Sequence, residues 1–331
     1  MTKQQTGSDA PWPVLGYVLR RVGYFAIVVL AVYTLAFLLL YALPSDPVAV
    51  MLDRRSSGAG GSTPEQIAEL RERYGLDEPL LVRYAGMFGR LLGGDLGVSF
   101  QSGQPVRDAL GAVAPNTLAL AGAALLIALP FSALLALVTS WRAGGVVHRL
   151  LVNLPALIAA IPAFWLGLLL LQVFSFTLRW APSTGGTGMT GLVLPAVALA
   201  LPVSAALTAV LVRSLDDVQR APFVTLLSAR GLRWRRVYLA HVARNALLPF
   251  LTLAGLTVGG VLAGTVITET VFSRSGLGRL LVSSVEAQDA PVVLAIAVFG
   301  AIVFGGVNLV VDLLYPLLDP RIRRPRSGAL A

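Results

Sequence analysis

The segment RAPFVTLLSARGLRWRR, residues 220–236, determines how the rest of the chain is interpreted. It belongs to a 33-residue polar stretch, 213–245, that holds seven arginines between two long uncharged apolar blocks. Pro222 suits the first position of a helix, and Gly231 suits the position just past a helix end. The pattern predicts a short surface helix that projects from a membrane-embedded body.

This predicted helix has one apolar stripe and a basic end. Phe223, Leu226 and Leu227 recur at i, i+3 and i+4, and Arg230 falls in the last turn, where the helix dipole favours a cation. A helix of this length spans about 13 Å at 1.5 Å per residue and is too short to be stable alone. We therefore expect it to dock in a groove on another protein; an amphipathic helix resting on lipid is the alternative.

The apolar residues, 56% of the chain against 13% charged, are gathered in blocks. Six blocks reach the ~20 residues needed to cross the hydrocarbon core of a membrane, and only the last contains a charge, Asp312. The blocks are Val22–Leu43, Thr117–Thr139, Leu150–Leu178, Leu192–Val212, Ala246–Thr268 and Pro291–Leu314. Buried helices of a soluble protein would show a polar face, so we expect an all-α integral membrane protein with six transmembrane helices.

The arginines also predict the orientation, because positive residues in short flanking segments stay in the cytoplasm. Arginines precede the first block, separate the second from the third and the fourth from the fifth, and follow the sixth. Both termini are therefore expected in the cytoplasm. The predicted parts are a cytoplasmic tail (1–21), a first span (22–43), an external subdomain (44–116), a core of five spans (117–314) that includes the cytoplasmic loop 213–245, and a second cytoplasmic tail (315–331).

The external segment has the pattern of a small folded unit. Residues 63–66, Thr-Pro-Glu-Gln, form a capping box, and a second amphipathic stretch covers 80–92 before Gly94 and Gly97 turn the chain. Such a unit could receive a soluble partner or could merely seal the outer mouth of a pathway.

Prolines stand inside several of the apolar blocks. Pro155 and Pro162, and likewise Pro195 and Pro202, are seven residues apart, which places both members of a pair on one helix face. Each proline frees a carbonyl that must find protein or water at membrane depth. The third and fourth spans are therefore predicted to line a wet pathway, with simple packing kinks as the alternative.

Several kinds of chemistry find no support in the sequence. There is no cysteine, there are only two histidines, far apart, and no Walker loop, HExxH motif or nucleophile motif occurs. The net charge of +9 is divided among short flanking segments, which favours topology and anionic lipid over nucleic acid. Glu269 and Asp312 lie near span ends rather than at mid-membrane, which disfavours an ion-coupled secondary transporter. Asp312 is expected to cap the last span or to pair with a nearby arginine.

Motifs along almost the whole chain carry a family resemblance. They are Pro44-Ser45-Asp46-Pro47, Tyr74-Gly75-Leu76-Asp77, Gly94-Asp95-Leu96-Gly97-Val98-Ser99, Pro162-Ala163-Phe164-Trp165-Leu166-Gly167, Glu269-Thr270-Val271-Phe272, Gly276-Leu277-Gly278 and Asp319-Pro320-Arg321-Ile322-Arg323. With these motifs the chain resembles the permease subunits of dipeptide/oligopeptide/nickel ATP-binding-cassette (ABC) importers, in the type with a long external segment after the first helix. The resemblance implies a type I importer fold in the cell (inner) membrane.

The resemblance also implies partners and roles. Residues 221–249 match the coupling loop that docks on a cytoplasmic ATPase, and the positions that fit its pattern are Gly231, His241, Arg244, Asn245 and Pro249. A second, similar permease subunit, two ATPases that hold ATP and Mg²⁺, and an external solute-binding protein are implied, while this chain is expected to be non-catalytic and to bind no cofactor, metal or nucleic acid. The chain departs from the family pattern at Ala221-Pro222 and Leu226-Leu227. Peptides are the first expectation for the cargo, with nickel, haem and other small solutes as alternatives.

Overall fold

A computed structural model describes residues 12–41, 78–141, 145–182, 188 and 190–318. In these residues the regular structure is helical, apart from one isolated antiparallel bridge between Val98 and Pro105. Five of the helices are long and apolar enough to cross a membrane, and the number becomes six if one bent pair forms a single span. The predicted all-α membrane fold is confirmed.

Five long helices correspond to the first, second, fourth, fifth and sixth predicted apolar blocks, and each extends beyond its block at one end or both. They are α1 (Trp12–Tyr41), α5 (Val106–Trp141), α8 (Thr190–Gln219), α11 (Ala243–Val271) and α13 (Ala290–Leu318). α5 begins at Val106, within the predicted external subdomain 44–116, whose boundary with the membrane stays a prediction. Polar residues such as Arg107 and Asp108 end the apolar block without ending the helix, since a helix can continue into water.

The predicted loop 213–245 is also largely helical. Within it, α8 continues to Gln219, and the remaining helices are α9 (Pro222–Ala229), α10 (Trp234–Val237) and the π-helical turn η2 (Tyr238–Val242), which runs into α11. The true connection between the two membrane helices is therefore the short region around α9. The polar composition of this stretch marks its exposure rather than an absence of helix.

The third predicted span, 150–178, is not one continuous helix. It consists of α6 (Gly145–Ala159), α7 (Ala163–Leu170) and the π-helix η1 (Leu171–Thr177), and the axis bends by 102° between α6 and α7. Pro162 is the N-cap of α7 with extended backbone angles, φ −59° and ψ 135°. A proline also drives the residue before it out of the helical region. The expectation that Pro155 and Pro162 share one helix face is therefore wrong.

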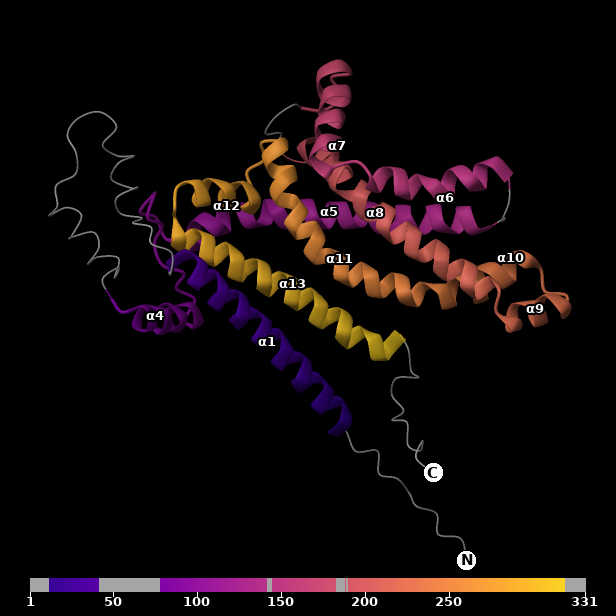
Figure 1. Ribbon diagram of the computed structural model, residues 1–331, viewed down its shortest axis with the longest axis horizontal. Helices are drawn as coiled ribbons and strands as arrows, with labels where there is room; N and C mark the ends of the chain where they lie inside the picture. The colour runs from indigo at the N-terminus through magenta and orange to yellow at the C-terminus, as the bar shows by residue number, and fades with distance from the viewer. Residues whose placement is uncertain (1–11, 42–77, 142–144, 183–187, 189, 319–331) are drawn as a thin grey trace, which may run out of the picture.

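The helices pack as a layered bundle (Figure 1). α5 and α11 both pack against α8, and α1 packs along α13. The interior between α5, α8 and α11 is lined by small residues such as Ala124 and Ala196, which allow the backbones to approach closely. A Cβ added at Gly264 of α11 would come within 2.6 Å of the end of the Leu199 side chain, so a larger residue there would displace Leu199.

Two groups of short helices lie at opposite ends of the bundle (Figure 1). α4 (Leu80–Leu92) and α12 (Leu277–Glu286) lie at one end, called here the α12 end, and α9 and α10 lie at the other, the α9 end. α4 coincides with the amphipathic stretch predicted at 80–92. The predicted capping box at 63–66 and both predicted tails from residue 11 down and from residue 319 on lie outside the described residues.

Candidate functional site

The helix α9 has the beginning and end that its sequence predicts. Ala221 is the N-cap with extended backbone angles, φ −69° and ψ 142°, and Pro222 occupies the first turn. Gly231 has φ +80°, and its N–H donates to the Ser228 carbonyl at 3.0 Å. A left-handed residue at this position closes the helix end, and glycine adopts it without steric cost.

The predicted apolar stripe of α9 is divided between the protein interior and the surface. Phe223 and Leu226 are 38% and 53% exposed, whereas Leu227 is half-buried against the core. Val224, which the sequence reasoning missed, is only 4% exposed and anchors α9 in that core. The sequence did contain a signal for the burial of Val224, because Val224 and Leu227 are three residues apart and lie on one helix face. The exposed pair that remains for a partner is Phe223 and Leu226.

The base beneath α9 is fixed by side chains that bind the last turn of α5. The last four carbonyls of a helix lack partners within it. Here Tyr238 Oη donates to the Leu137 carbonyl at 2.9 Å, Gln219 Nε2 to the Ser140 carbonyl at 3.1 Å, and Trp234 Nε1 to the Trp141 carbonyl at 3.4 Å. The end of α8 and the beginning of the α10–η2–α11 helix are thereby tied to α5.

The remaining predicted coupling residues lie on the helix that follows α9. His241 is half-buried, and Arg244, Asn245 and Pro249 are exposed. They share one face of η2 and α11, because the opposite face places Ala246 in the core. Asn245 Nδ2 donates to the His241 carbonyl at 2.7 Å. Arg230, at the end of α9, is exposed as well.

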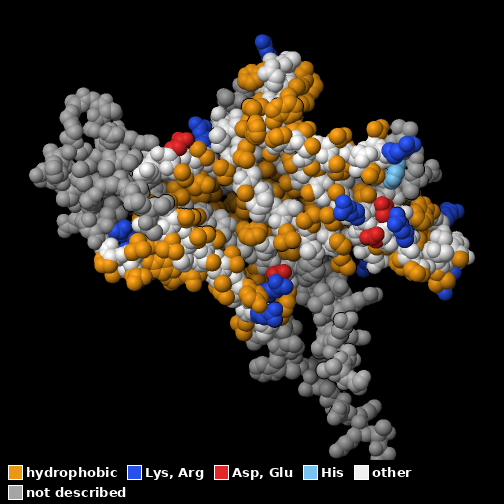
Figure 2. Space-filling model, viewed as in Figure 1, with side chains coloured by type: hydrophobic (Ala, Val, Ile, Leu, Met, Phe, Trp, Pro, Cys, Tyr) orange, Lys and Arg blue, Asp and Glu red, His pale blue; other side chains and the backbone are white. Residues whose placement is uncertain are grey.

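Basic side chains gather on the surface near α9 and α10 (Figure 2). Arg233, Arg235 and Arg236 are all exposed around the start of α10. Among the residues that the structure describes, no group of three His, Asp or Glu side chains is placed to hold a metal ion. The α9 end therefore combines an exposed apolar pair with positive charge, which suits a protein partner with a groove.

The four prolines predicted to line a pathway have different environments. Pro155 in α6 and Pro195 in α8 are buried, Pro202 in α8 is half-buried, and Pro162 is exposed at the bend. α8 passes through both of its prolines as one helix. Their role in a pathway stays a prediction.

A fully buried carboxyl group organises the α12 end. Glu269, at the end of α11, is 1% exposed. One oxygen accepts from Thr117 Oγ1 at 2.6 Å, and the other accepts from the N–H groups of Gly278 at 2.7 Å and Arg279 at 3.3 Å. The Thr117 hydroxyl also accepts from the Leu277 N–H at 2.7 Å. The first turn of α12 is therefore capped by side chains from two other helices.

The glycines near Glu269 have a steric reason. A Cβ added at Gly276 would overlap the Glu269 carboxyl group, and one at Gly278 would overlap the Val266 backbone. The Glu269-Thr270-Val271-Phe272 and Gly276-Leu277-Gly278 motifs therefore belong to one capping arrangement. Sequence alone located Glu269 near the end of a span but did not indicate its burial.

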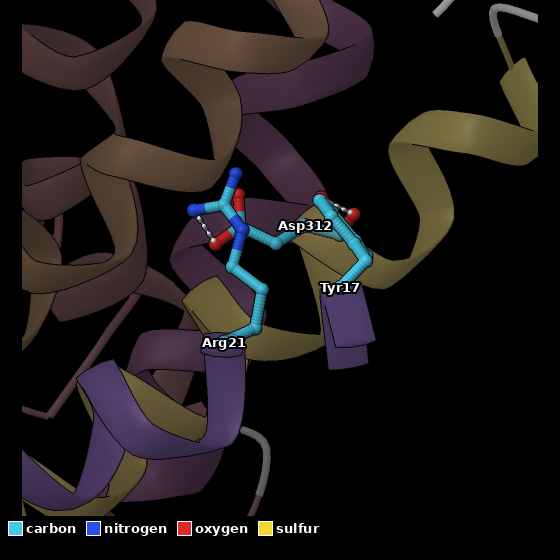
Figure 3. A network of polar contacts seen from close by, with 3 residues as sticks. All are labelled: Tyr17, Arg21 and Asp312. Atoms are coloured by element: carbon cyan, nitrogen blue, oxygen red, sulfur yellow. Dashed lines mark hydrogen bonds and ion pairs between the residues drawn. The ribbon is translucent and has the colours of Figure 1, made fainter. Parts of the chain in front are cut away.

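Two further carboxyl groups join segments distant in sequence. Asp289, 2% exposed, accepts from Ser99 Oγ at 2.5 Å and from the Phe100 N–H at 3.0 Å, which ties the loop after α4 to the corner before α13. Asp312 of α13 pairs with Arg21 of α1 at 2.7 Å, and the Tyr17 hydroxyl donates to the Asp312 carbonyl at 2.8 Å (Figure 3). The predicted pairing of Asp312 with an arginine is confirmed.

The bundle of long apolar helices is that of an integral membrane protein, and its sequence matches a known transport family. The family described as "Binding-protein-dependent transport system inner membrane component" matches residues 128–324, and its N-terminal region matches 14–121. The chain belongs to this family. It is a permease subunit of an ABC importer of the dipeptide/oligopeptide class, located in the inner membrane.

The chain is similar along nearly its whole length to curated permeases. It is 33% identical over 318 residues to the oligopeptide transport system permease protein AppB of Bacillus subtilis, which covers 92% of this chain and 98% of that protein. It is 34% identical over 311 residues to the glutathione transport system permease protein GsiC of Pectobacterium atrosepticum, which covers 94% of this chain and 99% of that protein. Proteins of this family work with ATPases and solute-binding proteins.

Proposed function

We propose that α9 is the element through which this permease subunit couples to a cytoplasmic ATPase. One observation carries the proposal: α9 is anchored in the core by Val224 and exposes Phe223 and Leu226 away from it. Exposed apolar side chains on a short helix fit a complementary groove in a partner. Because the base of α9 is tied to α5, α8 and α11, closure of the ATPases would move these helices together in an alternating-access cycle.

The proposed topology has six spans with both termini in the cytoplasm. Two hydrogen bonds between distant segments indicate at which end of the bundle α8 begins and α5 ends. The Arg274 side chain donates to the carbonyl of Gly191, which places the start of α8 at the α12 end, and Trp234 binds the last residue of α5 at the α9 end. The chain therefore crosses from end to end once in each long helix, with the bent α6–α7–η1 unit as the third crossing. The arginine distribution assigns the α9 end to the cytoplasm.

The proposed assembly contains a second, homologous permease subunit, two ATPases that bind ATP and Mg²⁺, and an extracytoplasmic solute-binding protein. This chain would form half of a translocation pathway for peptides or similar small solutes, which is the cargo class named for AppB and GsiC. Pro155, Pro162, Pro195 and Pro202 remain candidates for the pathway lining. Catalysis is assigned to the ATPases, and no cofactor is assigned to this chain.

The coupling role is tested by placing a charge on the exposed face of α9. In Leu226→Asp the carboxylate would be buried unpaired in the ATPase groove, so we expect the ATPases to be lost from the complex purified in nanodiscs. Thr225→Asp is the matched control, because Thr225 is exposed on the same helix and does not belong to the apolar stripe. Equal recovery of the ATPases with Leu226→Asp and Thr225→Asp would contradict the proposal.

The alternative of an ion-coupled secondary transporter is not favoured. The two candidate carboxyl groups are used in the structure: Glu269 caps α12, and Asp312 pairs with Arg21. The test is uptake into proteoliposomes that hold the whole complex, with either ATP or a pH gradient as the energy source. We expect ATP to be required, and uptake driven by the pH gradient without ATP would restore the alternative.

A further inference from the structure

The helix α4 is apolar on the face that points away from the protein. In α4, Leu81, Leu92 and Val82 are 81%, 74% and 55% exposed. Tyr84 and Phe88 pack against α1, and the face turned away from them, with Val82, Ala85, Gly86 and Gly89, is exposed and carries no charge. A helix at the boundary between protein and water places polar residues outward, so the outward face of α4 does not match an aqueous environment.

The contacts of α4 with α1 are extensive and specific. The Tyr84 ring lies 5.1 Å from the Tyr33 ring and 5.2 Å from the Phe37 ring, measured between centroids. The Tyr33 hydroxyl donates to the Tyr84 carbonyl at 2.9 Å, and the Tyr84 and Thr34 hydroxyl oxygens are 2.8 Å apart. These contacts fix the level of α4 along the axis of α1.

The apolar part of α1 is long enough for these contacts to fall within a hydrocarbon core. From Arg21 to Tyr41, α1 spans about 30 Å at 1.5 Å per residue, which is the thickness of the hydrocarbon core. Tyr33 lies about 12 Å before Tyr41 along the same axis. α4 is held against α1 at this depth, in the half of the membrane that belongs to the α12 end.

The charged residues of α4 suit a membrane position. Arg83 and Arg90 are its only charged residues, and their spacing of seven places them along one edge of the helix. The Arg83 guanidinium lies 5.6 Å from the centre of the Tyr41 ring and donates to the Glu78 carbonyl at 3.3 Å, both toward the end of α1. Long arginine side chains can keep their charge at the membrane surface while their stems contact lipid.

We propose that α4 lies within the leaflet on the α12 side of the membrane, with Leu81, Val82 and Leu92 in contact with lipid acyl chains. At the same level of α1, Leu35 and Leu38 are also exposed, at 61% and 44%. Figure 2 shows an apolar surface over this part of the molecule. α4 is thereby assigned to the membrane rather than to an aqueous external subdomain. The assignment rests on the proposed membrane crossings and not on the coupling role of α9.

The chain contains no cysteine, so single labels report one position each. Leu81→Cys and Leu92→Cys are to be spin-labelled in the full importer complex, reconstituted in phosphatidylcholine and phosphatidylglycerol vesicles. Collision rates with oxygen, which enters lipid, and with a water-soluble nickel chelate are then compared. Leu35→Cys on α1 is the control for lipid, and Ser102→Cys, on an exposed loop, is the control for water.

We expect labels at 81 and 92 to resemble the label at 35, with high oxygen and low nickel accessibility. Nickel accessibility equal to that at 102 would place α4 in water and overturn the proposal. Protection from both reagents would show that a protein partner covers the face, and would overturn it as well. Val82→Cys repeats the measurement if either variant fails to assemble. The readout does not depend on ATPase recruitment, so failure here is distinguishable from failure of the coupling role.

Discussion

The α12 end and the α9 end of the molecule differ in whether their side chains find partners within the chain. At the α12 end, Glu269 and Asp289 are at most 2% exposed, and their oxygens accept hydrogen bonds from backbone and hydroxyl groups of distant segments. At the α9 end, apolar side chains such as Leu226 are exposed beside arginines. The buried carboxyl groups of the α12 end find their partners within the chain, whereas the proposed coupling role has the exposed apolar side chains of the α9 end covered by a partner. Changes at the first should therefore affect folding, and changes at the second should affect assembly.

The largest effect is expected from Glu269→Ala. Loss of the carboxyl group leaves the Gly278 and Arg279 N–H groups and the Thr117 hydroxyl without their acceptor, which costs about 3 kcal/mol or more in a buried site. We expect a large fall in the thermal unfolding temperature of the purified protein in detergent. Glu269→Gln keeps the shape of the side chain, but its amide N–H groups face other hydrogen-bond donors. Its unfolding temperature should lie between those of the unchanged protein and Glu269→Ala.

The matched control is Asp217→Ala, which removes an exposed acidic residue at the α9 end. It should leave the unfolding temperature unchanged. If Glu269→Ala and Asp217→Ala unfold at the same temperature, the two ends do not differ as described.

Val224→Ala is expected to have the second largest effect, and it should lower both the stability of the protein and its assembly with the ATPases. It removes buried methyl groups from the core beneath α9, which costs about 2 kcal/mol. Because α9 loses its anchor, ATPase recovery should fall together with the unfolding temperature. Leu226→Ala, at an exposed position, should lower ATPase recovery while the unfolding temperature stays constant, and identical behaviour of the two variants would refute the division of the helix into two faces.

Much of this comparison was predictable from sequence, and the missing parts have physical causes. The ends of α9 were predicted by Pro222 and Gly231, because helix ends depend on local backbone preferences. The limits of α4 at 80–92 were predicted from local periodicity in the same way. The burial of Glu269 was not predicted, because its partner Thr117 is 152 positions away and no local pattern joins them.

Two other differences between the sequence-based expectations and the structure have separate causes. The proline spacing at 155 and 162 could not distinguish a kink from a 102° bend, because either conformation satisfies the proline ring. The sequence predicted a membrane block from 117, and α5 begins already at 106, because an apolar block marks the hydrocarbon core and not the helix end. Sequence therefore indicated which segments cross the membrane, but not how the ends are tied together.

Asp289→Asn should have a moderate effect. The amide keeps one oxygen that can accept from the Phe100 N–H but loses one acceptor for Ser99 and Gln101, which costs about 1–2 kcal/mol. The unfolding temperature should fall less than in Glu269→Ala. Proteolysis near the loop after α4 should become faster, because Asp289 ties that loop to the corner before α13. Unchanged proteolysis would show that other contacts hold the loop.

The smallest effect is expected at the Arg21–Asp312 pair. The pair has good geometry at 2.7 Å, but its side chains are 36% and 29% exposed, and partly solvated ion pairs contribute about 1 kcal/mol or less. A double-mutant cycle with Arg21→Gln and Asp312→Asn should therefore give a coupling energy in that range. Tyr17 should not contribute to the difference, because its hydroxyl binds the Asp312 backbone carbonyl, which both variants keep. ATP-driven uptake should persist in Asp312→Asn, since the carboxyl group of Asp312 pairs with Arg21 and fastens α1 to α13. Loss of uptake with a normal unfolding temperature would instead give Asp312 a role in transport.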